Sequence, residues 1–232
     1  GVPHAGILTD IMFLNRFPTT ATNRNRHRST KIQLFFLDTD ILGLADRPIN
    51  TTSDDANTHN PTSNNPNCTV CHFVMDPIAG AMQNWDARGR YNPMANGWYP
   101  EMMPPGFSLS DRMATSEYPT SMQWLSKKIV ADPKFARASV KLFYKALTGK
   151  DALSEPAYGA TYAAQTQQAY AFQDKVFSEI ESKFIASNMN AKVIIKELLK
   201  SAYFSGKSMS EGLENDVFSD SIGLAHLISP EI

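Results

Sequence analysis

Apolar side chains recur at the three- and four-residue spacing of an amphipathic helix through most of the chain. No run alternates apolar and polar residues as a half-buried strand would, so the pattern predicts a mostly α protein. Helices are expected over 5–16, 29–44, 121–130, 133–147, 158–185 and 190–204, with a weak last helix over 219–227. Ser29, Asp132 and Asn190 are the expected caps of three of them.

Two stretches break this pattern. Residues 47–67 are almost entirely Pro, Asn, Thr, Ser and Asp, which predicts an unusually long loop. A further helix is expected to begin after it, to restart behind Asp76-Pro77 and to run to residue 87, with Gly89 ending it. Residues 90–115, rich in Pro, Gly and aromatic side chains, should be irregular. The helical pattern resumes near residue 116, so two domains are expected, 1–115 and 116–232.

Composition excludes several classes of protein. The net charge of −1 provides no positive electrostatic field that would attract nucleic acid. A content of 42% hydrophobic and 19% charged residues is typical of a globular chain. No apolar run approaches the roughly 18 residues of a transmembrane helix. The chain starts at a glycine without a secretory leader and stops at Ser229-Pro230-Glu231-Ile232, so we expect a processed chain or a segment of a longer protein.

The two cysteines form the sequence Cys68-Thr69-Val70-Cys71-His72, which is the attachment motif of haem c. Cysteines three residues apart on a helical turn share a face and can bond both vinyl positions of one porphyrin. The histidine that follows is then held over the iron as its axial ligand. The motif therefore predicts a covalently attached haem c.

Three other interpretations of the cysteines compete with haem c. A thioredoxin-type redox pair should follow a strand, and none is predicted here. A zinc site could combine both cysteines with His72 and His59, but adjacent Cys71 and His72 make an awkward tetrahedral pair. A simple disulfide would need an oxidising compartment.

Residues around this motif resemble the cytochrome c-like domains of unknown function in large secreted proteins of planctomycetes, myxobacteria and proteobacteria. The resemblance rests on an opening, a basic turn and a long block around the cysteines: Gly6-Ile7-Leu8-Thr9, His27-Arg28-Ser29, Asn65-Pro66-Asn67-Cys68, Asp76-Pro77-Ile78-Ala79-Gly80 and Asn84-Trp85-Asp86-Ala87-Arg88-Gly89-Arg90-Tyr91. Ala79-Gly80 and the extra residues 60–64 depart from the family pattern.

The second half resembles the helical partner domain that follows in that family. The matching segments are Asp132-Pro133-Lys134-Phe135-Ala136, Leu147-Thr148-Gly149-Lys150, Ser201-Ala202-Tyr203-Phe204 and Leu227-Ile228-Ser229-Pro230-Glu231. The resemblance implies a c-type cytochrome-like haem domain with long irregular loops, followed by a helical domain, within a longer chain.

The sixth iron ligand is open between four side chains. Met102, on a proline-stiffened loop, is favoured; Met103, His59 and His27 are the alternatives, and an open iron position is a further possibility. Aromatic residues near the motif are candidates for the haem pocket, and two arginines could bind propionates. These candidates are Phe73, Trp85, Trp98, Tyr99, Phe107, Arg88 and Arg90.

The motif, with no catalytic constellation beside it, favours a mono-haem electron carrier that operates in the periplasm or outside the cell. Its partners would be a redox protein, other haem modules or further segments of the same precursor, and not nucleic acid. One alternative is a haem peroxidase or oxidase component whose iron has an open coordination position. The other is a structural module whose fold the covalently attached haem stabilises.

Overall fold

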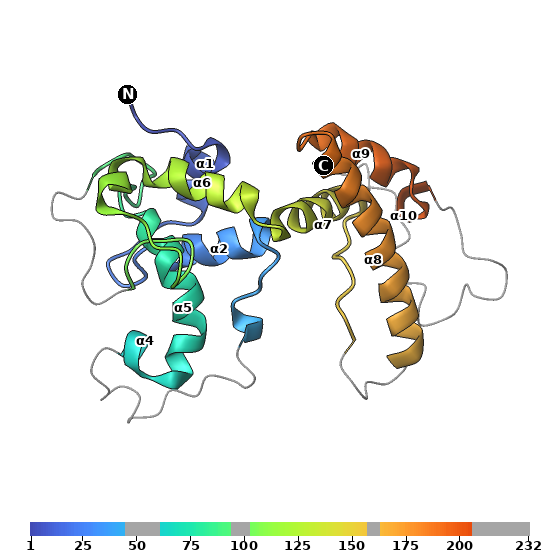
Figure 1. Cartoon of the computed structure of the whole chain (residues 1–232), viewed down its shortest axis with the longest axis horizontal. Coiled ribbons are helices and arrows are strands. Elements are labelled where there is room, and N and C mark those ends of the chain that lie inside the picture. Colours follow the sequence, from blue (N-terminus) through green and yellow to red (C-terminus); the bar gives the residue numbers. More distant parts are fainter. Residues whose placement is uncertain (45–60, 94–102, 157–162, 206–232) are drawn as a thin grey trace. The chain divides into compact units, whose positions relative to one another are not determined.

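The computed structural model describes residues 1–44, 61–93, 103–156 and 163–205 (Figure 1). These residues are mostly helical and include two isolated β-bridges, Trp85–Tyr91 and Gly106–Arg112, but no strand, so the mostly α prediction is confirmed. None of the helices described is both long and apolar enough to span a membrane. In chain order the elements are η1 (Gly6–Thr9), α1 (Ile11–Arg16), α2 (Arg26–Phe36), η2 (Leu42–Leu44), α4 (Pro61–Asn64), α5 (Pro66–Ala81), η3 (Thr115–Thr120), α6 (Ser121–Ala131), α7 (Lys134–Thr148), α8 (Ala163–Ala186), α9 (Ala191–Lys200) and α10 (Ala202–Ser205).

The chain divides into two compact units, residues 1–135 and 136–232. The first is built around an apolar core to which η1, α1, α2, α5 and α6 each contribute. Its buried members are Leu8, Phe13, Leu14, Ile32, Leu37, Ile78, Ala81, Met82, Trp85, Met113, Met122, Leu125 and Ile129. Burial of these side chains is the main force that holds the unit together.

The division between the two units falls after residue 135, twenty residues beyond the domain boundary expected at 115, because α6 packs on the first unit. One face of α6 packs into the apolar core of the first unit. The side chains on this face are Met122, Leu125 and Ile129. Ser121 Oγ also donates a hydrogen bond of 2.5 Å to the carbonyl of Ala81, at the end of α5. The change in composition near residue 116 thus precedes the division between the compact units.

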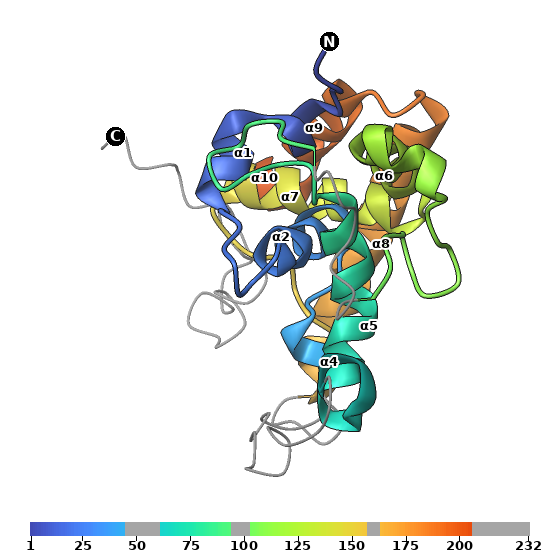
Figure 2. The same cartoon turned by 90° about the vertical axis from the view of Figure 1, so that its left-hand side faces the viewer.

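Helices α2 and α5 pack side by side in the first unit (Figures 1 and 2). Ser29 Oγ of α2 donates a hydrogen bond of 2.7 Å to the carbonyl of Met75. Gly106 N donates a hydrogen bond of 3.1 Å to the carbonyl of Pro77. These bonds support backbone around Pro77, a residue that would weaken an isolated helix. Helix α5 therefore runs through Asp76-Pro77 without the restart that was expected, and it ends at Ala81 rather than at 87.

Other element boundaries also differ from expectation. The first helix is split by Asp10, which ends η1 and caps α1 by accepting from Met12 N at 2.8 Å. Helix α2 begins at Arg26 and ends at Phe36, so Ser29 lies inside it instead of capping it. Asn190 caps α9 as predicted, with its side chain accepting from Lys192 N. The expected helix over 219–227 lies outside the described residues.

The second unit has an aromatic core of its own. Tyr144 of α7 packs edge-on against Phe177 of α8, with ring centroids 5.2 Å apart, and against Tyr203 of α10 at 5.8 Å. Ile194 and Leu198 of α9 are buried in the same unit. Asp132, at the link to α7, accepts from Lys134 N at 2.8 Å, in agreement with its expected capping role.

Gly89 lies in the turn between Trp85 and Tyr91, at a φ of +69°. A Cβ there would lie 3.0 Å from the Cβ of Leu14 in the core. Gly89→Ala should therefore combine backbone strain with a steric clash and lower the free energy of unfolding by about 2–3 kcal/mol. Urea denaturation of the purified variant measures this loss.

Gly6→Ala is the matched control in the same unit. Gly6 also has a positive φ, +58°, but a Cβ there would meet nothing within 4 Å. It should cost about 1 kcal/mol, from strain alone. Equal losses for the two variants would show that the contact with Leu14 is unimportant.

Candidate functional site

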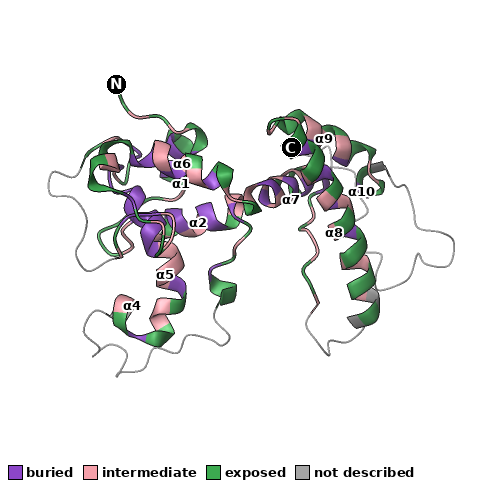
Figure 3. Ribbon diagram, in the orientation of Figure 1, coloured by how far each residue is buried: buried purple, intermediate pink, exposed green. Residues whose placement is uncertain are grey.

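Cys68, Cys71 and His72 lie in the first two turns of α5. The helix begins where Asn65 caps it, its side chain accepting from Asn67 N at 2.8 Å, and Pro66 occupies the first helical position. At about 100° per residue, the three side chains fall within about 100° of arc on one face. The N-terminal half of α5 is largely exposed or half-buried, whereas its C-terminal half is buried in the core (Figure 3).

The two cysteines are not joined in a disulfide. Cys68 is half-buried, and Cys71 is 7% exposed with its Sγ 3.5 Å from the carbonyl oxygen of Ile41. Burial, and secondarily Cys68, raise the pKa of the Cys71 thiol. A raised pKa lowers the fraction of reactive thiolate at Cys71.

His72 is oriented by a carboxylate one turn further along α5. Its Nδ1 lies 2.9 Å from Oδ1 of Asp76, and its side chain is 18% exposed. Because this contact uses Nδ1, Nε2 is the ring nitrogen that can ligate a metal.

Asp76 is fully buried and is paired with Arg26 of α2 as well as with His72. Arg26 Nε donates a hydrogen bond of 2.8 Å to Oδ1, and its Nη2 donates one of 3.1 Å to Oδ2. The guanidinium therefore binds the carboxylate in a bidentate way. Burial raises the pKa of Asp76, but the hydrogen bonds from His72 and Arg26 outweigh it, so the pKa lies below its usual value. Asp76 is therefore a fixed negative charge beside His72.

Arg28 lies two residues after Arg26 on α2, and its side chain connects separate segments of the first unit. Its side chain is 0% exposed, and burial, partly opposed by Asp86, lowers its pKa to about 10. The guanidinium donates five hydrogen bonds of 2.7–3.0 Å. Their acceptors are the carbonyls of Leu14, Phe17, Trp85 and Asp86 and the side chain of Asn25.

The pocket candidates fall in different environments. Trp85 is a core residue whose ring packs edge-on against Tyr91 at 5.5 Å. Arg88 and Arg90 are exposed, and their backbone N–H groups both donate to Oδ1 of Asp86. The structure thus assigns these residues to a tight turn, and their proposed roles at a haem stay predictions.

Of the remaining pocket candidates, Phe73 is half-buried on α5, next to His72. Phe107 is half-buried against the core of the first unit, and its N–H donates 2.9 Å to the carbonyl of Asp111. Trp98 and Tyr99 lie outside the described residues.

Two of the four candidates for a sixth ligand are described. Met103 is half-buried, and His27 is exposed on α2 with its ring 5.3 Å from that of Phe17, in an edge-on contact. Burial and the neighbouring Lys31 lower the pKa of His27. Met102 and His59 lie outside the described residues, so the choice of ligand stays a prediction.

Sequence reasoning missed the contribution of Arg26 and Asp76 to this site. Asp76 was interpreted only as the start of a helical segment, although its spacing of four from His72 is that of neighbours on one helix face. Arg26 is 50 residues away in sequence, and no local pattern connects it to Asp76.

The side chains of the motif suit the attachment chemistry of a haem c. Among the described residues, which do not include His59, no group of three or more His, Cys, Asp and Glu side chains is arranged to hold a metal ion. Two thiols outside a disulfide, followed by an imidazole with its Nδ1 already bonded, match the needs of two thioether links and one axial nitrogen.

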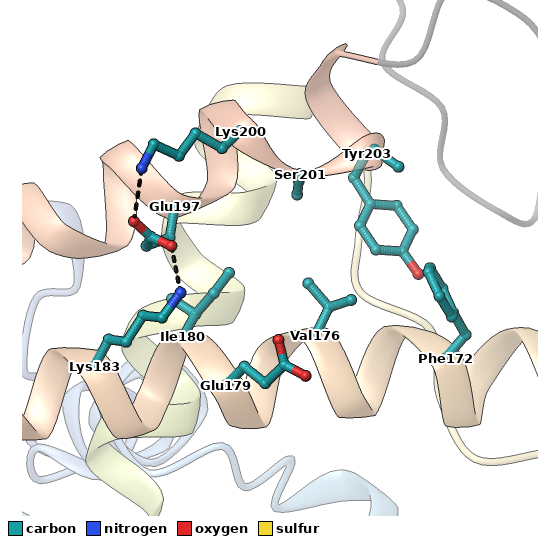
Figure 4. Close-up of a pocket in the computed structure, with 10 residues that line it drawn as sticks. Phe172, Val176, Glu179, Ile180, Lys183, Glu197, Lys200, Ser201 and Tyr203 are labelled. Carbon is teal, nitrogen blue, oxygen red and sulfur yellow. Dashed lines mark hydrogen bonds and ion pairs between the residues drawn. The ribbon is translucent and has the colours of Figure 1, made fainter.

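A separate pocket of about 230 Å³ lies in the second unit, between α8, α9 and α10 (Figure 4). Phe172 and Tyr203 line one end of it. At the other, Glu197 pairs with Lys183 at 2.6 Å and Lys200 at 3.3 Å. These charges satisfy one another, and the lining contains neither cysteine nor histidine.

Part of the chain matches a known protein family. Residues 4–94 match the family PSCyt3, described as a protein of unknown function (DUF1588). No curated protein and no solved structure matches the chain. The matched segment includes α1, α2, α5 and the turn up to Tyr91. Over these residues the chain is thus similar to a cytochrome-c-related domain of planctomycetes, one whose function is unknown.

Proposed function

We propose that the first unit is a mono-haem c-type cytochrome module that carries single electrons outside the cytoplasm. The observation that carries the proposal is the arrangement on α5, where two thiols outside a disulfide precede a histidine whose Nδ1 is bonded to a buried carboxylate. The similarity of residues 4–94 to a cytochrome-c-related domain supports it.

Each residue of the motif has a distinct task in this proposal. The Sγ atoms of Cys68 and Cys71 form the two thioether bonds, and Nε2 of His72 binds the iron. When bound, the haem supplies a one-electron couple between iron(III) and iron(II). Asn65 and Pro66 fix the start of α5, and with it the positions of the two thiols.

An electron carrier needs no general acid, base or nucleophile, and no such constellation was found beside the motif in the sequence. Its partners would be a redox protein, other haem modules or further segments of a longer precursor. The location outside the cytoplasm follows from the attachment chemistry of haem c.

A redox titration of the protein, produced with a cytochrome c maturation system, tests this function. We expect a reversible one-electron transition and a six-coordinate, low-spin iron that binds carbon monoxide slowly. A high-spin iron that binds carbon monoxide or cyanide at once would favour the enzyme. A haem that is attached but not reversibly reduced would favour the structural module.

The sixth ligand can be assigned by substitution. In Met102→Ala the weak far-red absorption band of methionine-ligated ferric haem should disappear completely, and the reduction potential should fall, because a thioether ligand raises it. Optical spectra of the oxidised protein measure the band.

Met103→Ala is the control, because it removes the neighbouring thioether. Its band should persist if Met102 is the ligand. Loss of the band in Met103→Ala alone would move the ligand to Met103, and a low-spin wild-type spectrum without the band would favour His59 or His27.

A further inference from the structure

His72 is held by a charged pair that connects two helices. Oδ1 of Asp76 accepts from Arg26 Nε at 2.8 Å and lies 2.9 Å from His72 Nδ1, so one carboxylate oxygen serves both residues. Oδ2 accepts from Arg26 Nη2 at 3.1 Å. The carboxylate is 0% exposed, so water does not compete for these bonds.

Contacts between α2 and α5 hold the Arg26–Asp76 pair in place independently of His72. Arg26 is the first residue of α2, which is bonded to α5 by Ser29 Oγ to the carbonyl of Met75, at 2.7 Å. Thr30 Oγ1 also lies 3.4 Å from Sδ of Met75. The carboxylate of Asp76 is thus fixed from both helices, and it can act as a stationary acceptor.

A neutral imidazole carries its proton on one of two nitrogens, and the hydrogen bond of one nitrogen decides the state of the other. A carboxylate cannot donate when ionised, so its contact requires the proton on Nδ1. We propose that Asp76, held by Arg26, is a positioning residue that keeps the proton of His72 on Nδ1 and leaves Nε2 unprotonated, ready to bind iron. The iron-binding part of this inference rests on the proposed function.

The tautomer can be measured on the haem-free full chain, made without a maturation system. Nitrogen-15 NMR of His72 distinguishes the two neutral forms of the ring. We expect the Nδ1–H form to dominate in the wild type. In Asp76→Leu the ratio of Nδ1–H to Nε2–H should fall about tenfold or more, because a hydrogen bond to a charged group is lost.

Two further variants keep the test decisive. Arg26→Met combined with Asp76→Leu replaces the buried ion pair with apolar side chains, an exchange that proteins often tolerate, and it should shift the tautomer equally. Asp111→Leu removes a carboxylate paired with Lys128 elsewhere in the same unit and should leave His72 unchanged. A dominant Nε2–H form in the wild type, or no change without Asp76, would overturn the proposal.

The haem-loaded protein offers an independent measurement. Loss of the buried carboxylate should weaken the donation by His72 and raise the reduction potential, by about 59 mV for each tenfold loss of preference for iron(III). Absence of covalent haem in the wild type would contradict the proposed function, whereas the tautomer of His72 would still decide the role of Asp76. An unchanged potential in the loaded Asp76→Leu protein would contradict the link to iron.

Discussion

Arg28→Met should lower the free energy of unfolding of the first unit by about 3–5 kcal/mol. The substitution removes five hydrogen bonds at once, and of their acceptors the carbonyl of Asp86 still accepts from Gly89 N at 3.2 Å. Buried acceptors left without partners cost about 1–3 kcal/mol each before the structure relaxes. All three tryptophans lie within residues 1–135, so tryptophan fluorescence during urea denaturation follows this unit alone.

Arg112→Met is the control for this change. Arg112 is exposed and donates to the carbonyls of Leu109 and Pro104, so the same substitution there should cost less than about 1 kcal/mol. If the two variants lose similar stability, Arg28 does not connect the first unit as its hydrogen bonds suggest.

Cys68→Ala combined with Cys71→Ala should abolish covalent attachment of haem altogether. With both thiols gone, no thioether can form, and any haem held by His72 alone should be removed by acidified organic solvent. Haem staining of a denaturing gel should show the band in the wild type and none in the double variant.

Each single cysteine variant is an informative control, since one thioether can still form. We therefore expect a reduced but visible haem band in Cys68→Ala and in Cys71→Ala. Haem that stays attached to the double variant would contradict the assignment of these cysteines.

Most helices of this protein were predictable because their apolar spacing is regular. Helix α2 shows where such reasoning fails. Phe35, Phe36 and Leu37 continue the apolar pattern, but the helix ends at Phe36, because Asp38 adopts a φ of +45° and Thr39 N bonds back to the carbonyl of Gln33. No glycine or proline marks this end, so the sequence contains no ordinary stop signal.

The candidate site likewise combines residues that a local pattern predicts with contacts that only the folded structure creates. Cys68, Cys71 and His72 are predicted from their spacing alone, which encodes a local geometry, and their role stays a prediction. The contacts of Arg26 with Asp76 and of Arg28 with Trp85 join residues 50 and 57 positions apart, and only the packing of the first unit creates them. Asp76-Pro77 was expected to restart the helix, which concealed the pairing of Asp76 with His72.

The attachment of haem is tested most directly by the mass of the purified chain after maturation, measured under denaturing conditions. The account predicts the mass of the polypeptide plus a single haem, together with the optical spectrum of a c-type cytochrome in the same sample. A chain that has passed through the same maturation system and shows only the mass of the polypeptide, or that mass less two hydrogens from a disulfide between Cys68 and Cys71, would contradict it.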